Sequence, residues 1–181
     1  MIRAAADKVV LGPKRTPNQD LEFSIDALVE IALRALSPGI NDPRTAMTCI
    51  DRLAEALAHF MRIGSRPALL HDEDGALRLI LHPTTFDGAI DASLNQIRQA
   101  ADGHVAVLIR LIGVLTELAE ITVSEEQRSA VARHGDMVRR ASRRSIVEPE
   151  DRSDVERELR RLDATLFMGP EPDAGSRPPP A

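Results

Sequence analysis

The chain has 181 residues, which fits one domain, and its 43% hydrophobic and 28% charged residues exclude an intrinsically disordered protein. A net charge of −5 and the absence of Tyr and Trp disfavour phosphate-backbone binding and base stacking, so we predict no nucleic-acid partner. With four Phe as the only aromatic residues, the core must be mainly aliphatic, which favours packed helices over a sandwich or a barrel.

The sequence offers no membrane-spanning or export segment. No apolar run approaches the roughly 20 residues that a bilayer-spanning helix needs, and the first residues are too polar for a signal peptide. We therefore expect the chain as given to be soluble, and cytoplasmic by default. The single cysteine, Cys49, excludes an internal disulfide and fits a small buried side chain on a helix.

The first two predicted helices form an antiparallel pair. Apolar residues recur at spacings of three and four over residues 20–37, which indicates one helical face. Ser37-Pro38-Gly39 ends this helix, because proline cannot continue it and glycine readily takes left-handed angles. Asp42 is a good N-cap and Pro43 fits the first helical position, so we predict a second helix from Pro43 to about Ile63.

A β-hairpin is predicted over residues 67–82, where two short apolar runs flank the turn His71-Asp72-Glu73-Asp74-Gly75. A two-residue turn at Asp74-Gly75 would place His71 opposite Arg78. Because a lone hairpin is only marginally stable, we expect it to lie against the helices. The turn lacks the ligand spacing of a calcium loop, so we interpret it as solvated.

The remaining sequence predicts four more helices. One begins near residues 83–85 and ends at Asp102-Gly103, and the next, over residues 104–121, is apolar on nearly every side and is placed at the centre of the fold. Ser124-Glu125-Glu126-Gln127 is a capping box that opens the fifth helix, and Pro149 restarts the chain as the sixth.

These elements predict a mainly α fold, an antiparallel bundle of about six helices with one small inserted β-hairpin. The expected organisation is a single helical domain over residues 1–168 and a disordered Pro-rich tail over residues 169–181. Within the domain we expect a helix-turn-helix signature (14–63), the hairpin (67–82), bundle helices (83–147) and a C-terminal helix (149–168).

The sequence carries no recognisable catalytic or metal-binding motif. Its five histidines form no His-x-x-x-His pair, and there is no Gly-rich phosphate loop and no Gly-x-Ser-x-Gly elbow. We therefore predict no catalytic residue, no metal and no cofactor, and lean against an enzyme. Arg110 lies among aliphatic residues within a helix, so we expect an ion pair with Asp91, Glu30 or Asp51.

A basic run, Arg139-Arg140-Ala141-Ser142-Arg143-Arg144, precedes an acidic stretch over residues 148–158. The favoured interpretation is two solvated helix faces that attract each other. The alternative is a patch that contacts anionic lipid headgroups.

The turn between the first two helices is the candidate binding site. Short polar side chains and one cation meet there, and our hypothesis is a small polar pocket. A well-capped tight turn is the competing interpretation. The residues of the hypothetical ligand site are Arg34, Ser37, Asn41, Asp42 and Thr45.

Two phrases of the sequence carry a family resemblance: residues 15–25 (RTPNQDLEFSI) and residues 31–46 (IALRALSPGINDPRTA), followed by Cys49-Ile50-Asp51-Arg52-Leu53. Together they resemble the soluble C-terminal part of a bacterial family of predicted membrane proteins, domain of unknown function 2254. The resemblance covers roughly residues 9–140. It implies membrane association and a membrane portion as partner, and it supplies no catalytic residue.

The function expected from these observations is a non-enzymatic regulatory or protein-interaction domain, whose partner is the membrane portion of a related protein or another protein. One alternative is a small-ligand-binding or enzymatic domain that uses the Ser37–Thr45 turn. Another is a homo-oligomerisation module, because a domain separated from a membrane neighbour should expose an apolar face.

Overall fold

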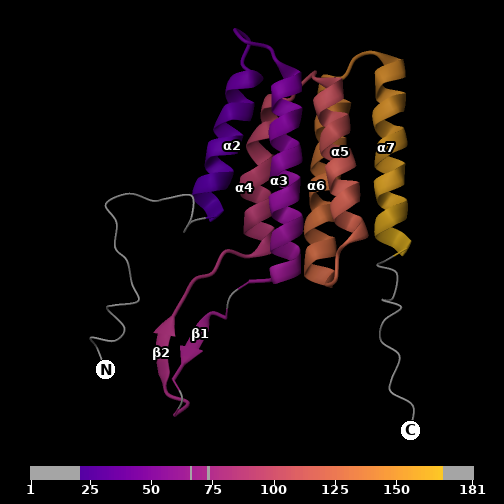
Figure 1. Ribbon diagram of the computed structural model, residues 1–181. Coiled ribbons are helices and arrows are strands. Elements are labelled where there is room, and N and C mark those ends of the chain that lie inside the picture. The colour runs from indigo at the N-terminus through magenta and orange to yellow at the C-terminus, as the bar shows by residue number, and fades with distance from the viewer. Residues whose placement is uncertain (1–20, 66, 73, 169–181) are drawn as a thin grey trace.

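The computed structural model describes residues 21–65, 67–72 and 74–168 (Figure 1). Within these residues the chain forms six helices and a two-stranded antiparallel sheet, so the predicted mainly α fold is confirmed. The helices are α2 (Leu21–Ala35), α3 (Pro43–Ile63), α4 (Phe86–Ala100), α5 (Val105–Glu120), α6 (Glu125–Ser145) and α7 (Pro149–Met168), and the strands are β1 (Leu69–His71) and β2 (Leu77–Ile80). The hypothetical Pro-rich tail lies outside the described residues.

The helices alternate in direction and lie side by side as an antiparallel bundle (Figure 1). Helices α3, α4, α5 and α6 form a central group of four. Helix α2 packs against α3 and α4 on one flank, while α7 packs against α5 and α6 on the other. One continuous aliphatic core runs through all six helices.

Helix α5 lies in the interior, as its sequence predicts. It contacts α3, α4, α6 and α7, and nine of its residues are buried. A helix with apolar side chains around most of its circumference needs neighbours on most sides, and the bundle supplies them. The structure also buries Cys49 on α3, as expected.

The N-terminal caps read from the sequence are present. The Asp42 carboxylate accepts a hydrogen bond from the Thr45 N–H at 3.1 Å, and Pro43 occupies the first turn of α3. The Ser124 hydroxyl oxygen accepts from the Gln127 N–H at 3.2 Å. The Gln127 side chain reaches back to the Val123 N–H at 2.9 Å, one residue before the position expected for a capping box. These bonds fix where α3 and α6 begin.

The hairpin forms, but its register differs from the predicted one. Leu69 pairs with Ile80 and Leu70 with Leu79, and then the ladder slips so that His71 stands opposite Leu77. The predicted pairing of His71 with Arg78 is therefore wrong. Arg78 instead turns its Nε toward the Asp72 carboxylate at 2.6 Å, which leaves it as the extra residue of a bulge.

The hairpin projects beyond the bundle instead of lying against it (Figure 1). Its five large aliphatic side chains are 39–59% exposed, so the expectation that the helices would cover them is wrong. The cause is the direction of the connections, because α3 and α4 meet the hairpin at their ends and the strands continue away from that end of the bundle (Figure 1). The aliphatic residues concerned are Leu69, Leu70, Leu77, Leu79 and Ile80.

Candidate functional site

The polar turn between α2 and α3 holds the five residues of the predicted ligand site, and most of their polar groups serve the turn itself. The Arg34 guanidinium binds Glu30, one turn earlier on α2, at 2.5 Å. The Ser37 hydroxyl donates to the Arg34 carbonyl oxygen at 2.7 Å. Asn41 adopts a left-handed backbone with φ of 48°, and its N–H donates to the Ser37 carbonyl at 2.9 Å.

Asp42 and Thr45 are engaged with each other at the start of α3. The Thr45 hydroxyl donates to the Asp42 carboxylate at 2.5 Å, alongside the backbone bond already described. These bonds lower the pKa of Asp42, so the cap stays ionised at neutral pH. Asp42 and Thr45 are thus brought together, while Arg34 is paired with Glu30. Ligand binding at this turn stays a prediction.

Arg110 on α5 joins two helices. Its Nε donates to Asp51 on α3 at 2.5 Å, so of the three partners considered from the sequence, Asp51 is the one that the fold selects. Its Nη1 also donates to Glu117 at 2.9 Å. Sequence reasoning missed Glu117, although a spacing of seven residues places it two turns along the same face of α5. The side chain is 32% exposed, which fits a cation at the edge of the core with two carboxylates.

Two open grooves lie beside Arg110. One, of about 380 Å³, runs between α5 and α7, and the other, of about 340 Å³, lies between α3 and α5. Arg110 and Glu117 border both grooves. Their volumes are at the lower end of the range for small-molecule sites. Because the Arg110 guanidinium already has two carboxylate partners, the geometry accounts for this charge as a tie between α3 and α5.

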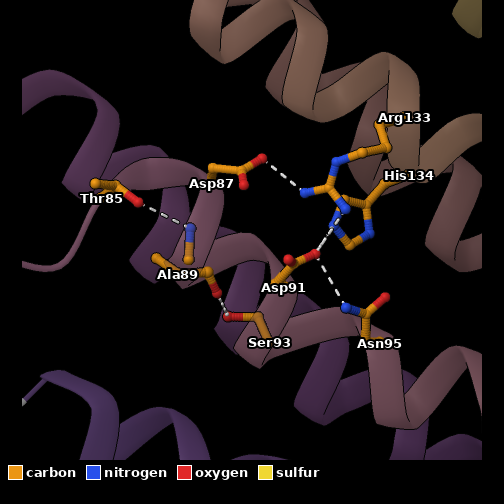
Figure 2. Close-up of polar contacts among 9 residues, drawn as sticks. Thr85, Asp87, Ala89, Asp91, Ser93, Asn95, Arg133 and His134 are labelled. Carbon is orange, nitrogen blue, oxygen red and sulfur yellow. Dashed lines mark hydrogen bonds and ion pairs between the residues drawn. The ribbon is translucent and has the colours of Figure 1, made fainter.

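Asp91 on α4 is the centre of a polar cluster with Asp87, Asn95, Arg133 and His134, called here the Asp91 group (Figure 2). One of its carboxylate oxygens, Oδ1, faces Arg133 Nη1 at 2.9 Å, His134 Nε2 at 3.0 Å and Asn95 Nδ2 at 3.0 Å. Arg133 also binds Asp87, one turn earlier on α4, at 2.6 Å. This group therefore ties α4 to α6 through two neighbouring residues of α6.

Burial and the neighbouring charges together set the protonation of His134 and Asp91. His134 is 1% exposed, and burial, followed by the nearby Arg133 charge, lowers the pKa of its imidazole to about 4. The ring is therefore neutral at pH 7, and its Nε2–H donates to Asp91. Burial tends to raise the pKa of Asp91, but the Arg133 guanidinium and His134 outweigh it and leave that pKa lowered. Neutral His134 and ionised Asp91 form a fixed donor–acceptor pair.

No local sequence motif predicts the Asp91 group. Asp91 and His134 are 43 residues apart, and only the packing of α4 on α6 brings them together. The one available signal is the spacing of four between Asp87, Asp91 and Asn95, which marks a polar stripe on α4. Within the described parts of the chain, no cluster of three or more His, Cys, Asp and Glu side chains could hold a metal ion.

The fold and these contacts define a class: an antiparallel six-helix bundle whose helices are tied by interhelical ion pairs and whose hairpin stands outside the core. The chain belongs to the family described as "Predicted membrane protein (DUF2254)", which matches residues 1–117. The family resemblance read from the sequence is thereby confirmed. Among the described helices, none combines the length and the apolar character needed to cross a membrane.

The chain is similar to uncharacterized proteins of Mycobacterium bovis and Mycobacterium tuberculosis. Each is 31% identical to it over 147 residues, which cover 81% of this chain and 28% of the relative. The chain therefore spans little more than a quarter of the length of the curated relatives it matches. No solved structure matches it.

Proposed function

We propose that this chain is a protein-interaction domain of its membrane-protein family and that its hairpin joins it to a second copy of itself. The observation that carries the proposal is the exposure of five large aliphatic side chains among the seven residues of β1 and β2. Neighbouring residues of a strand point to opposite faces, so the Leu69–Ile80 pair and the Leu70–Leu79 pair make both faces of the hairpin apolar. A monomeric protein rarely leaves such a patch uncovered.

The exposed edges and faces of the hairpin favour the hairpin of a second copy as its binding partner. A two-stranded sheet has two outer edges, and an isolated hairpin is marginally stable in water. A second copy supplies both strand edges and apolar faces of the same composition. Pairing about a two-fold axis would give a four-stranded sheet with the same residues on each side of the interface.

The tip of the hairpin disfavours insertion into a lipid bilayer. Asp72 and Asp74 lie at the tip, and the Asp72 carboxylate accepts hydrogen bonds from the Ala76 N–H at 2.8 Å and from Arg78 Nε at 2.6 Å. These bonds lower the pKa of Asp72 and keep it ionised. Carrying such a charge into hydrocarbon is costly. The membrane portion of the longer family proteins is the alternative occupant, because the chain corresponds to only 28% of its relatives.

The test is the oligomeric state of the chain, measured by native mass spectrometry and by light scattering over a range of protein concentrations. We expect a dimer in the unmodified chain and a monomer in a variant that combines Leu70→Ser with Leu79→Ser. Val147→Ser is the matched control, because Val147 is 83% exposed and lies between α6 and α7, away from the hairpin. The control should remain dimeric.

Three outcomes would overturn the proposal. One is a monomer at every concentration, and another is a dimer that the hairpin variant does not change. The third is a monomer that binds phosphatidylcholine vesicles and loses that binding in the hairpin variant, which would assign the hairpin to a membrane surface. The mass spectrum also reports any small molecule retained by the protein, which tests the ligand hypothesis for the Ser37–Thr45 turn.

A further inference from the structure

One strip of helix α5 is left uncovered where it lies between α3 and α7 on the side of the bundle (Figure 1). The two grooves beside Arg110, of about 380 and 340 Å³, lie on either side of this strip and share Arg110 and Glu117. We call the two together the α5 groove. The α5 residues that line it recur at spacings of three and four, and they are Ala106, Ile109, Arg110, Gly113, Glu117 and Glu120.

The half of the α5 groove nearest the start of α5 is apolar. Met47 on α3 and Ile109 on α5 are half-buried and pack against the edge of the core, and Ala106 is exposed. Gly113 lies in the middle of α5, where glycine is less favourable than alanine. A methyl group there would lie 3.3 Å from Arg110 Nη1, so the glycine keeps the floor of the groove open beside the guanidinium. The backbone of another molecule can therefore approach α5 closely.

The rest of the α5 groove carries an excess of negative charge. The acidic side chains that line it are Asp51, Glu55, Glu117, Glu120 and Glu158. The cations that line it are Arg110, which is bound to two of these carboxylates, and Arg161. Glu120 and Glu158 form no hydrogen bond or ion pair with another residue that the structure describes. These two carboxylates can therefore meet cations from outside the bundle.

The basic run of α6 is used on another side of α7. Arg139 binds Asp163 on α7 at 2.6 Å, and Arg143 binds Glu156 on α7 at 3.2 Å. These contacts confirm the predicted attraction between the basic run and the acidic stretch. They lie between α6 and α7, whereas Glu158 lines the groove between α5 and α7. The basic run therefore leaves the negative charge of the α5 groove unbalanced.

We propose that the α5 groove binds an amphipathic helix of a partner protein, with small aliphatic side chains at one end of its contact face and Lys or Arg at the other. Such a helix would place its aliphatic side chains on Met47, Ile109 and Gly113 and its cations beside Glu120 and Glu158. Apolar contact supplies the affinity of a helix held in a groove, and complementary charge fixes its direction. This surface is independent of the hairpin, which stands beyond the end of the bundle (Figure 1).

The shape of the α5 groove favours a helix over an extended peptide. An extended peptide binds by adding a strand to a free sheet edge, and the walls and floor of this groove are helices. The 16 residues of α5 span about 24 Å, which matches about four turns of a partner helix. Side chains of such a helix can fit between those of α5 and its neighbours, as in other packed helices.

The test uses a synthetic, fluorescently labelled peptide of about 18 residues that is long enough to cover α5. It carries Leu and Ala at helical spacing on one face and Lys along the border of that face. The control peptide has Glu in place of every Lys. Binding is measured by fluorescence anisotropy with the full 181-residue chain and with the Leu70→Ser and Leu79→Ser double variant, which removes the apolar hairpin as a competing site.

We expect the Lys peptide to bind both forms of the chain equally and about tenfold or more tightly than the Glu peptide. Glu120→Lys and Glu158→Lys should each weaken binding by about fivefold or more through charge reversal. Ala106→Gln should do the same by filling the apolar floor. Asp26→Lys is the matched control, because it makes the same charge change at an exposed position on α2, on the opposite flank of the bundle. Thermal unfolding checks that each variant is folded.

Four results would overturn the proposal. Two concern the peptides: no binding of the Lys peptide, or equal binding of the Glu peptide. The third is a loss of binding in the hairpin variant or an equal loss in Asp26→Lys, which would indicate adhesion to the hairpin or unspecific attraction between charges. The fourth is a dimer that persists in the hairpin variant and dissociates in Glu120→Lys, which would assign the groove to a second copy of the chain.

Discussion

The hairpin and helix α5 use nearly the same side chains and reach opposite environments. Leu and Ile in the strands are 39–59% exposed, while Leu111, Ile112 and Leu115 on α5 are at most 1% exposed. The difference lies in their neighbours: α5 contacts four helices, and the hairpin leaves the bundle at its end. Aliphatic side chains favour burial, but the fold determines whether other parts of the same chain cover them.

The bundle and the hairpin should therefore contribute differently to the stability of the monomer. Fully burying a large aliphatic side chain contributes about 1.5–3 kcal/mol, so the stability of the monomer resides in the bundle. The hairpin contributes little to that stability, because its apolar side chains stay exposed. Substitutions in the two regions should therefore differ in kind as well as in size.

The largest expected effect is the loss of a core leucine from α5. Leu111→Ala should lower the free energy of unfolding by about 2–5 kcal/mol, because it removes buried methyl groups and leaves a cavity. Leu79→Ala is the matched control on the hairpin and should change the free energy of unfolding by less than about 0.5 kcal/mol. Denaturant unfolding at a concentration where the chain is monomeric measures both. Similar losses in the two variants would contradict the division between bundle and hairpin.

The second prediction concerns the contact between His134 on α6 and Asp91 on α4. Unlike the exposed apolar hairpin, this contact is polar, and His134 is buried. The pKa of His134 is lowered from 6.5 to about 4 in the folded protein. Between these values the unfolded chain binds a proton and the folded chain does not, so acid favours unfolding. Stability should fall by about 3 kcal/mol as the pH drops from 6.5 to 4, and it should be unaffected by this group above pH 6.5.

His134→Gln isolates that contribution. The amide can still donate to Asp91 but does not titrate, so the dependence of unfolding free energy on pH should be flatter between pH 6.5 and 5 than in the unmodified chain. Asp91, whose pKa is lowered, loses its contribution at more acidic pH, when the carboxylate itself takes up a proton. Identical slopes for the variant and the unmodified chain above pH 5 would rule out His134 as the source.

The smallest effect tests how closely α6 and α7 approach. A methyl group on Gly135 of α6 would lie 2.7 Å from Leu162 Cδ2 on α7, and Leu162 is fully buried. Gly135→Ala should therefore destabilise the bundle by about 1–3 kcal/mol through overpacking. Adding Leu162→Val shortens the opposing side chain and should recover part of the loss, as thermal unfolding of the single and double variants would show. A neutral Gly135→Ala would mean that the two helices are not in close contact.

Much of the fold follows from local sequence signals. The N-cap at Asp42 and the capping box at Ser124 are short-range hydrogen-bond patterns, so the starts of α3 and α6 were predicted to within a residue. The Asp91 group could not be predicted from the sequence, because Asp91 and His134 are 43 positions apart. The register of the hairpin also escaped prediction, because a bulge at Arg78 arises from its contact with Asp72.

The sequence by itself determined the helices, their caps, the aliphatic core and the family, because each depends on a local pattern or on a long shared phrase. The tertiary structure alone decided which polar groups meet: Arg110 with Asp51, and His134 with Asp91. It also decided that the hairpin stands apart from the bundle. The physical reason is that periodicity sets the face on which a side chain lies, whereas the packing of distant helices sets what that face touches.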